Sequence, residues 1–206
     1  SSMFRISSDG TPYVHDNPKR PRLIKPKGQT CESLRRDMAK DWQLKKRRPV
    51  RRKHIAPLLK DLEEALGIDL AVDGAFLEMA DYGPWKMVLV DRVPLAVELM
   101  SPDEERVVFL TLRGFLAHPC EKRYVEVDHG AIPFLMKGAD CMVAGIHNAD
   151  EEIAEGDLVW VRDQEHKRPL AIGWAVKDGS SLVKELKGKG LKNIHWVGDE
   201  LWEMEL

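Results

Sequence analysis

The residues in this chain that could do chemistry are mostly cations and small residues, which suit contact with phosphate. Cations neutralise phosphate charge, and a backbone without bulky side chains lets a nucleic-acid strand approach closely. One set is a basic run, residues 45–53, in which seven of nine residues are Lys or Arg. A second set lies within residues 127–146, with two further lysines downstream. The candidate nucleic-acid-binding residues are Arg47, Arg48, Arg51, Arg52 and Lys53 in the first set, and Gly130, Ala131, Lys137, Gly138, Ala139, Lys187 and Lys189 in the second.

The basic run has two interpretations that the sequence leaves open. A cluster of cations is typical of a solvated tail or import-like signal, and equally of a nucleic-acid contact. Pro49 excludes one continuous helix across the run. Because the run follows no apolar period, we expect that replacing the four arginines of residues 47–52 with Gln leaves the stability of the fold unchanged.

The second set is predicted to fold as a strand, a short helix, a tight turn and a strand. Ile132 and Leu135 share one helical face, Asp128 precedes the helix as a candidate N-cap, and Gly138 suits its left-handed end. Small residues at both helix ends would admit a nucleic-acid backbone, but they could also simply make tight turns in a small β fold. The Lys-Gly-Lys-Gly segment at 187–190 also has two interpretations, a phosphate-binding loop or a flexible turn.

Composition indicates a globular protein in a reducing compartment. The 206 residues are 43% hydrophobic and 32% charged, which suits one or two domains with a real core. No apolar run approaches the roughly 18 residues of a membrane span, and no secretory signal is expected. Three cysteines without a C-x-x-C pair argue against a structural zinc site. We therefore expect a cytoplasmic protein that has no membrane contact, binds no metal and needs no cofactor.

The net charge of −2 conceals a strong asymmetry along the chain. Residues 1–54 hold 16 Lys or Arg against 5 Asp or Glu, a net charge of +11, whereas residues 55–206 carry −13. Within the latter, residues 121–206 hold 11 Lys or Arg against 17 Asp or Glu, a net charge of −6. A nucleic acid would therefore meet this C-terminal part only at a local patch; otherwise the acidic face meets a protein, and the basic N-terminal region carries the nucleic-acid contact. The patch would be formed by Lys137, Lys184, Lys187, Lys189 and Lys192.

The pattern of elements predicts an α+β protein in three parts. A flexible basic tail is expected at residues 1–30, an N-terminal α+β domain at 31–118, and a barrel of short strands at 122–206. The strongest helix is 55–66, where an apolar stripe ends at Gly67. Apolar residues at helical spacing, Leu34, Met38 and Trp42, indicate a further helix at 34–42. Strands are expected at 70–79, 86–90, 95–99, 107–112, 158–161 and 169–176.

Two sequence patterns in the C-terminal part resemble a known family. The first is Asp128-His129-Gly130-Ala131, six residues, Gly138-Ala139, then Gly145-Ile146, which resembles the PUA domain, a small RNA-binding pseudo-β-barrel. The second is the ending at 188–196 (GKGLKNIHW) and 199–204 (DELWEM), together with the junction at 109–119 (FLTLRGFLAHP). These segments resemble the malignant-T-cell-amplified-sequence family and its archaeal relatives. The likeness covers residues 55–206 and leaves out the basic segment before them.

The resemblance implies a pre-PUA α+β domain followed by a PUA pseudo-β-barrel, and a role in translation. Members of that family act at the small ribosomal subunit in initiation, reinitiation and recycling, near the tRNA acceptor end, paired with density-regulated protein. The expected partners are therefore tRNA or rRNA, the small ribosomal subunit and a density-regulated-protein-like protein.

Two alternatives to an RNA-binding translation factor stay open at this point. One is a ribosome-associated protein–protein adaptor with weak RNA affinity, which the acidic C-terminal part motivates. The other is an accessory subunit of an RNA-modification enzyme, because PUA domains often accompany such enzymes. We expect no enzymatic activity in this chain, since its N-terminal half has no paired-carboxylate, Cys–His or glycine-rich cofactor motif.

Overall fold

The structure is a computed structural model that describes residues 5–6, 12–13, 42–70 and 72–206. The chain divides into two compact units, residues 1–38 and 39–206, which are considered separately. The described elements of the first unit are an antiparallel pair of strands, β1 (Arg5–Ile6) and β2 (Pro12–Tyr13). The rest of the predicted tail, and all of the predicted helical spacing except Trp42, lie outside the described residues.

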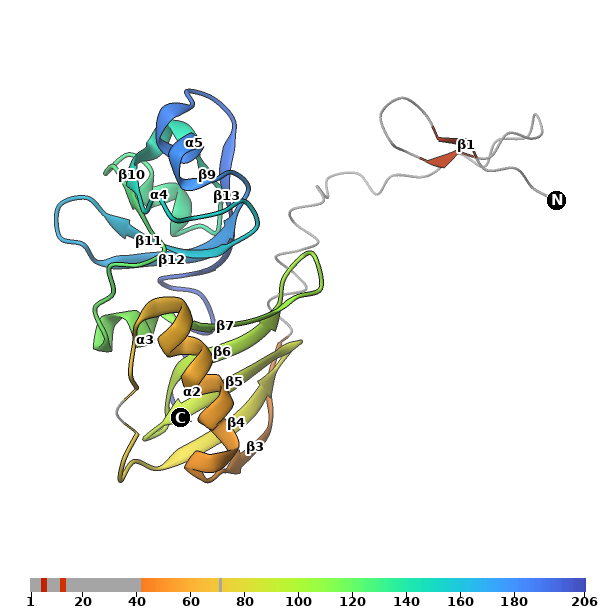
Figure 1. Ribbon diagram of the computed structural model, residues 1–206, viewed down its shortest axis with the longest axis vertical. Coiled ribbons are helices and arrows are strands. Elements are labelled where there is room, and N and C mark those ends of the chain that lie inside the picture. The colour runs from red at the N-terminus through yellow and green to blue at the C-terminus, as the bar shows by residue number, and fades with distance from the viewer. Residues whose placement is uncertain (1–4, 7–11, 14–41, 71) are drawn as a thin grey trace. The chain divides into compact units, whose positions relative to one another are not determined.

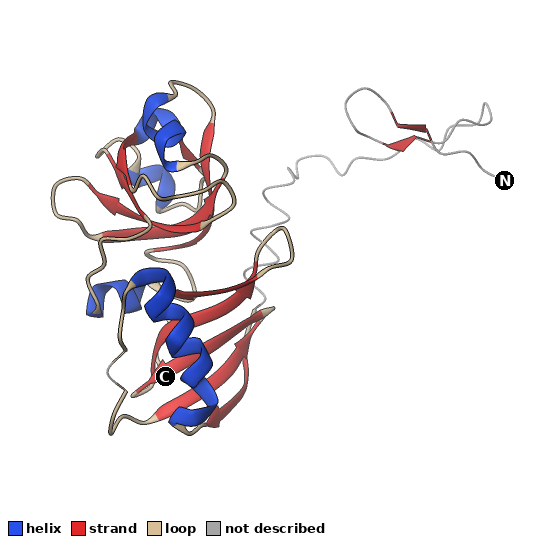
Figure 2. Cartoon of the chain, in the orientation of Figure 1, coloured by secondary structure: helices blue, strands red, loops and turns tan. Residues whose placement is uncertain are grey.

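The second unit begins with a five-stranded antiparallel sheet that has one long helix, α2 (Arg52–Leu66), across one face (Figures 1 and 2). The strand order is β3-β4-β5-β6-β7, so β3 and β7 form its two edges. The strands are β3 (Leu44–Pro49), β4 (Leu77–Tyr82), β5 (Trp85–Val90), β6 (Val93–Met100) and β7 (Arg106–Leu110).

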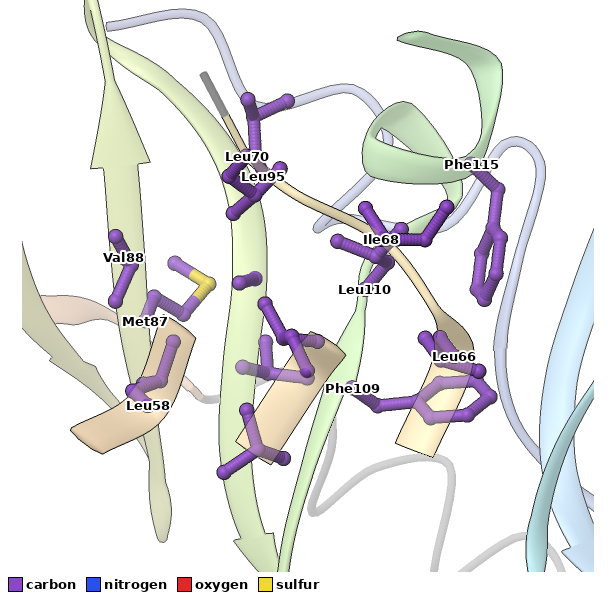
Figure 3. Packing of buried hydrophobic residues seen from close by; sticks show 14 of the residues in the cluster. Leu58, Leu66, Ile68, Leu70, Met87, Val88, Leu95, Phe109, Leu110 and Phe115 are labelled. Carbon is purple, nitrogen blue, oxygen red and sulfur yellow. The ribbon is translucent and has the colours of Figure 1, made fainter. Parts of the chain in front are cut away.

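Helix α2 confirms the strongest prediction from the sequence. Ile55, Leu58 and Leu62 are at most 4% exposed, because the apolar stripe of the helix packs on the sheet. Figure 3 shows Leu58 beside side chains of β5, such as Met87. Gly67 ends the helix with φ +67°, and its N–H donates to Glu63 O at 2.9 Å. The helix begins three residues earlier than predicted, so the end of the basic run forms its first turn.

The strand predicted at 70–79 is wrong in its first half, because β4 begins only at Leu77. Ile68, Leu70 and Val72 alternate as strand residues do, and all three are buried. They belong instead to a connection after α2 whose alternate side chains enter the core, where Figure 3 shows Leu70 beside Leu95 and Ile68 beside Leu110. Period-two burial does not require a hydrogen-bonded partner strand, and the described residues of this segment, 68–70 and 72, show the alternation without being part of a strand.

A short helix, α3 (Leu112–Ala117), replaces the end of the strand predicted at 107–112. Thr111 caps it: its hydroxyl oxygen accepts from the N–H of Gly114 at 3.1 Å, and the hydroxyl donates to Pro94 O at 2.7 Å. A Cβ at Gly114 would lie 2.3 Å from Leu95 O, so only glycine lets the helix approach β6. The sequence indicated only a junction at 109–119, and this short helix was not predicted.

Residues 121–206 form a six-stranded sheet with the order β10-β8-β11-β12-β13-β9. Strand β8 runs parallel to β11, and the other pairs are antiparallel. This arrangement confirms the predicted α+β class. The elements are β8 (Tyr124–Val127), α4 (Ile132–Leu135), β9 (Cys141–Met142), η1 (Val143–Gly145), β10 (Ile146–Ala149), β11 (Leu158–Asp163), β12 (Pro169–Ala175), α5 (Gly179–Lys184) and β13 (Lys189–Trp196).

A buried ionic network ties β8 to β11 in this sheet. The Arg162 side chain is 5% exposed; it donates to Glu126 at 2.8 Å and to Glu121 at 3.1 Å, and its guanidinium lies 3.9 Å from the Tyr124 ring centroid. Burial opposes ionisation of Glu126, but bonds from Lys167 and Arg162 outweigh it and hold the pKa of Glu126 below its ordinary value. Arg162 and Glu126 are also register partners in the parallel pair, so the ion pair joins directly neighbouring positions of the two strands.

One apolar core joins the N-terminal sheet to the outer face of β11, β12 and β13. Phe115 of α3 stacks on Trp160 of β11, with ring centroids 4.7 Å apart and an interplanar angle of 16°. His195 of β13 accepts from the N–H of Leu112 at 3.4 Å through Nε2, and its Nδ1 lies 2.6 Å from Asp199. The two halves of residues 42–206 are therefore packed together and not merely linked.

The C-terminal segment after β13 returns to the N-terminal sheet. Leu201 is 3% exposed within the shared core, and Arg113 of α3 donates to Trp202 O at 2.6 Å. Burial, together with the charges of Asp199 and Glu200, raises the pKa of Tyr82 on β4 to about 12. The last ten residues thus help to hold the two halves together.

We predict that Phe115→Ala lowers the free energy of unfolding by about 3–5 kcal/mol, because it opens a cavity where the two halves meet. Chemical denaturation followed by tryptophan fluorescence measures this loss. Leu186→Ala is the control, since Leu186 is 84% exposed and its loss should change the stability by less than about 0.5 kcal/mol. Equal stability of the two variants would contradict a shared core.

Candidate nucleic-acid interface

Helix α4 and the turn after it form the centre of the second candidate set. Asp128 Oδ1 accepts from the N–H of Ala131 at 3.1 Å, which fixes the chain where it enters the helix. Leu135 is buried, whereas Phe134 is 65% exposed. Gly138 ends the turn with φ +79°, and its N–H donates to Leu135 O at 2.9 Å. The strand, helix and turn predicted here are therefore confirmed, although the helix has only four residues.

The small residues around α4 differ in what surrounds them. A Cβ at Gly138 would lie 2.7 Å from the ring of Trp196, so this glycine admits the protein's own tryptophan. A Cβ at Gly145 would lie 3.0 Å from the Cβ of Ala131, which places Ala131 against the 3-10 turn η1. Gly130 is exposed and would meet only Asp128 Oδ1, at 3.3 Å. Packing accounts for Gly138 and Ala131, whereas Gly130 leaves backbone open to a ligand.

Asn193 of β13 holds this turn, and sequence analysis did not single it out. Its side-chain amide donates to Leu135 O at 3.3 Å and to Ala139 O at 3.1 Å, and its backbone N–H donates to Asp140 Oδ1 at 3.0 Å. These bonds fasten the turn to a central strand. A single Asn in a strand carries no pattern that would identify it in advance.

The lysines of the second set are not equivalent. Lys137 and Lys187 are exposed, and among the described residues neither has a carboxylate within 4.0 Å. Lys189 instead pairs with Asp140 at 2.7 Å. The predicted loop at 187–190 is only partly a loop, because β13 begins at Lys189 and Gly190 is buried against Ile146 and Leu182.

The basic run forms most of the edge strand β3 and the beginning of α2, so it is not a solvated tail. Arg47 Nε and Nη2 donate to the two carboxylate oxygens of Glu78, at 2.8 and 2.9 Å, and Glu78 is 5% exposed. These hydrogen bonds raise the pKa of Arg47 above its ordinary value. The expectation that all four arginines could be replaced without effect on stability is therefore wrong for Arg47, whose loss would leave a buried carboxylate unpaired.

Reactive groups and metal ligands are not gathered in the part of the chain that the structure describes. No three His, Cys, Asp or Glu side chains there are placed to hold a metal ion. Burial, reinforced by Asp128 and Asp140, raises the pKa of the Cys141 thiol to about 12, so this thiol stays protonated. Within the same residues, no helix has the length and apolarity that a membrane crossing requires.

We predict that Gly138→Ala destabilises the protein by about 1–3 kcal/mol, because the new methyl group would overlap the Trp196 ring at a left-handed backbone position. Gly130→Ala is the matched control, since its backbone is not left-handed and an added Cβ would meet only the side chain of Asp128, at 3.3 Å from Oδ1. Thermal unfolding of both variants checks this. An unchanged midpoint for Gly138→Ala would show that the turn is not packed on Trp196.

Comparison with known proteins places this geometry in a family. Residues 123–197 match the PUA domain. An uncharacterized protein of Methanocaldococcus jannaschii is 40% identical over 129 residues, which cover 63% of this chain and 76% of that protein. Translation machinery-associated protein 20 of Schizosaccharomyces pombe is 34% identical over 145 residues, which cover 59% of this chain and 80% of that protein.

A solved structure agrees with the sequence comparisons. The crystal structure of a hypothetical protein from Pyrococcus horikoshii OT3 superposes with a TM-score of 0.64 at 29% identity, over 76% of this chain and 98% of that one. The fold is thus an α+β protein with a PUA domain at its C-terminal end. The chain belongs to the PUA-domain family that includes translation machinery-associated protein 20 and the malignant T-cell-amplified sequence proteins.

Proposed function

We propose that this chain is an RNA-binding translation factor that acts by binding, without catalysing a reaction. Its ligand is tRNA or rRNA at the small ribosomal subunit, and its work lies in initiation, reinitiation or recycling in the cytoplasm. The PUA domain and the names of the relatives support a role in translation. A density-regulated-protein-like partner is part of the same proposal.

The observation that carries the proposal is the pair of exposed lysines, Lys137 and Lys187, whose charges no carboxylate of the described residues neutralises. Lys137 follows α4 directly, and the helix also presents Phe134, 65% exposed. An exposed aromatic ring beside a cation suits an unpaired nucleotide, because the ring stacks on a base while the cation meets a phosphate. We therefore place RNA backbone or an unpaired 3′ end along the α4 turn, with Gly130, Ala131, Gly138, Ala139 and Lys189 as its surroundings.

A rigid support makes this surface effective. Asn193 and Trp196 hold the turn from behind, so Lys137 projects from a backbone that is already ordered. Ordering before binding lowers the entropy that RNA binding must overcome. This is how a domain with a net charge of −6 can bind a polyanion at one place.

The adaptor function remains the second candidate, because residues 121–206 are acidic overall. Acidic side chains gather beside β8 and β10, at Glu121, Asp150, Glu151 and Glu152, where they line an open hollow together with Tyr124. Such a surface suits a basic protein segment better than it suits RNA. Retained small-subunit binding by a variant that no longer binds RNA would favour this alternative.

We predict that Lys137→Gln with Lys187→Gln weakens binding of tRNA and lowers the slope of log affinity against log salt by about 1.4 to 1.8, at roughly 0.7 to 0.9 per phosphate contact. Filter binding at four or more salt concentrations measures the slope. The control is Lys60→Gln with Lys86→Gln, which removes the same charge from exposed sites of α2 and β5. Equal salt slopes for both variants and the unmodified chain would contradict RNA binding at the α4 surface.

A further inference from the structure

A strongly charged surface lies where edge strand β3 meets the start of α2, outside the PUA domain. Ten residues here contribute seven cations and His54, and the structure separates those cations into two groups. Three are neutralised by the protein itself: Lys46 lies 3.3 Å from Asp81, Arg47 lies 2.8 Å from Glu78, and Arg52 lies 2.9 Å from Asp73.

The other four cations remain without such partners. Among the described residues no carboxylate lies within 4.0 Å of their charged groups, and all four are exposed. We call this group the basic ridge; it consists of Lys45, Arg48, Arg51 and Lys53.

A β-bulge produces this separation. Lys45 pairs with Asp81 and Arg48 pairs with Met79, so two residues of β3 stand opposite one residue of β4. Lys46 lies within the bulge and has a left-handed backbone conformation, with φ +51°. The bulge lets Arg47 reach Glu78 while Arg48 stays exposed. Within this edge strand, Arg47 therefore stabilises the fold, whereas the next residue, Arg48, is exposed to solvent.

The start of α2 adds to the positive potential of the ridge. Arg51 occupies the N-cap position without a side-chain cap, and the first turn of this 15-residue helix contains no acidic residue. Helix N-termini favour negative charge, and cations there are unfavourable. An external anion would relieve the repulsion between Arg51 and Lys53 and would also suit the positive end of the helix dipole.

The composition of the ridge favours RNA backbone over an acidic protein. Residues 44–54 contribute no exposed large apolar side chain, and a protein partner would normally need such an anchor. The four side chains of the ridge are all Lys or Arg, so every one of them can meet a phosphate. Lys and Arg alone make contacts to phosphate that are independent of sequence.

We propose that the basic ridge is a second RNA-binding site, which contacts the phosphate backbone without reading sequence. The inference rests on the proposed function in that its ligand is the RNA bound by the PUA domain. Because residues 39–206 form one compact unit, both sites can act on the same molecule, and the second contact raises affinity through local concentration. The sequence-independent ridge supplies affinity that an acidic PUA domain lacks.

The test compares two double variants of the full chain. Arg48→Gln with Arg51→Gln removes half of the ridge, and Lys60→Gln with Lys86→Gln removes the same charge elsewhere. For tRNA and for an unrelated RNA of equal length, we expect the ridge variant to lower the salt slope by about 1.4 to 1.8, with an unchanged thermal midpoint. The control should keep the slope. Arg47 is left intact because its loss would disturb Glu78.

The outcomes separate this inference from the proposed function. An unchanged slope in the ridge variant, with a reduced slope in the Lys137 and Lys187 variant, would overturn the ridge and leave the PUA site. Reduced slopes in both variants support both sites. Loss of small-subunit binding with unchanged RNA binding in the ridge variant would overturn the ridge as an RNA site and assign it to a protein. No RNA binding by the unmodified chain would overturn both.

Discussion

The packing of Phe115 on Trp160 is the contact on which the rest of residues 42–206 depends. It lies at the middle of a core that continues from the N-terminal sheet to the outer face of β11, β12 and β13. His195 and Leu201 extend the same contact from the C-terminal end of the chain. Because β13 also carries Asn193 and Trp196, the strand that anchors the domain interface supports the α4 turn as well. The interface thereby positions the proposed RNA surface.

Charge is distributed by the fold in a way that net charge does not reveal. Carboxylates neutralise Lys46, Arg47, Arg52 and Lys189, whereas Lys137, Lys187 and the basic ridge extend from the surface without such partners among the described residues. A protein with a formal charge of −2 can thus present two positive surfaces. Affinity for a polyanion depends on these local groups, because salt at about 0.1 M largely screens exposed charges that are more than about 10 Å apart.

Much of this fold could be predicted from local patterns, and the exceptions have physical reasons. Helix α2 and the α4 turn were predictable because an apolar stripe or a glycine end marks each one. The connection at Leu70 and Val72 was predicted as strand, since alternate burial is shared by strands and by extended segments that enter a core. Strand β3 was missed because an edge strand with outward cations has no apolar alternation. The roles of Arg47 and Asn193 depend on partners 31 and 54 residues away, so no local pattern could show them.

The most direct test of the central claim is hydrogen–deuterium exchange of the full chain with and without bound tRNA. We predict slower exchange on binding in peptides that cover residues 130–139 and 187–189, which contain the exposed Lys137 and Lys187. Peptides from the exposed loop at 164–168, on another part of the PUA domain, should exchange as before. Unchanged exchange around α4, with protection confined to other segments of a complex that does form, would contradict the RNA surface placed here.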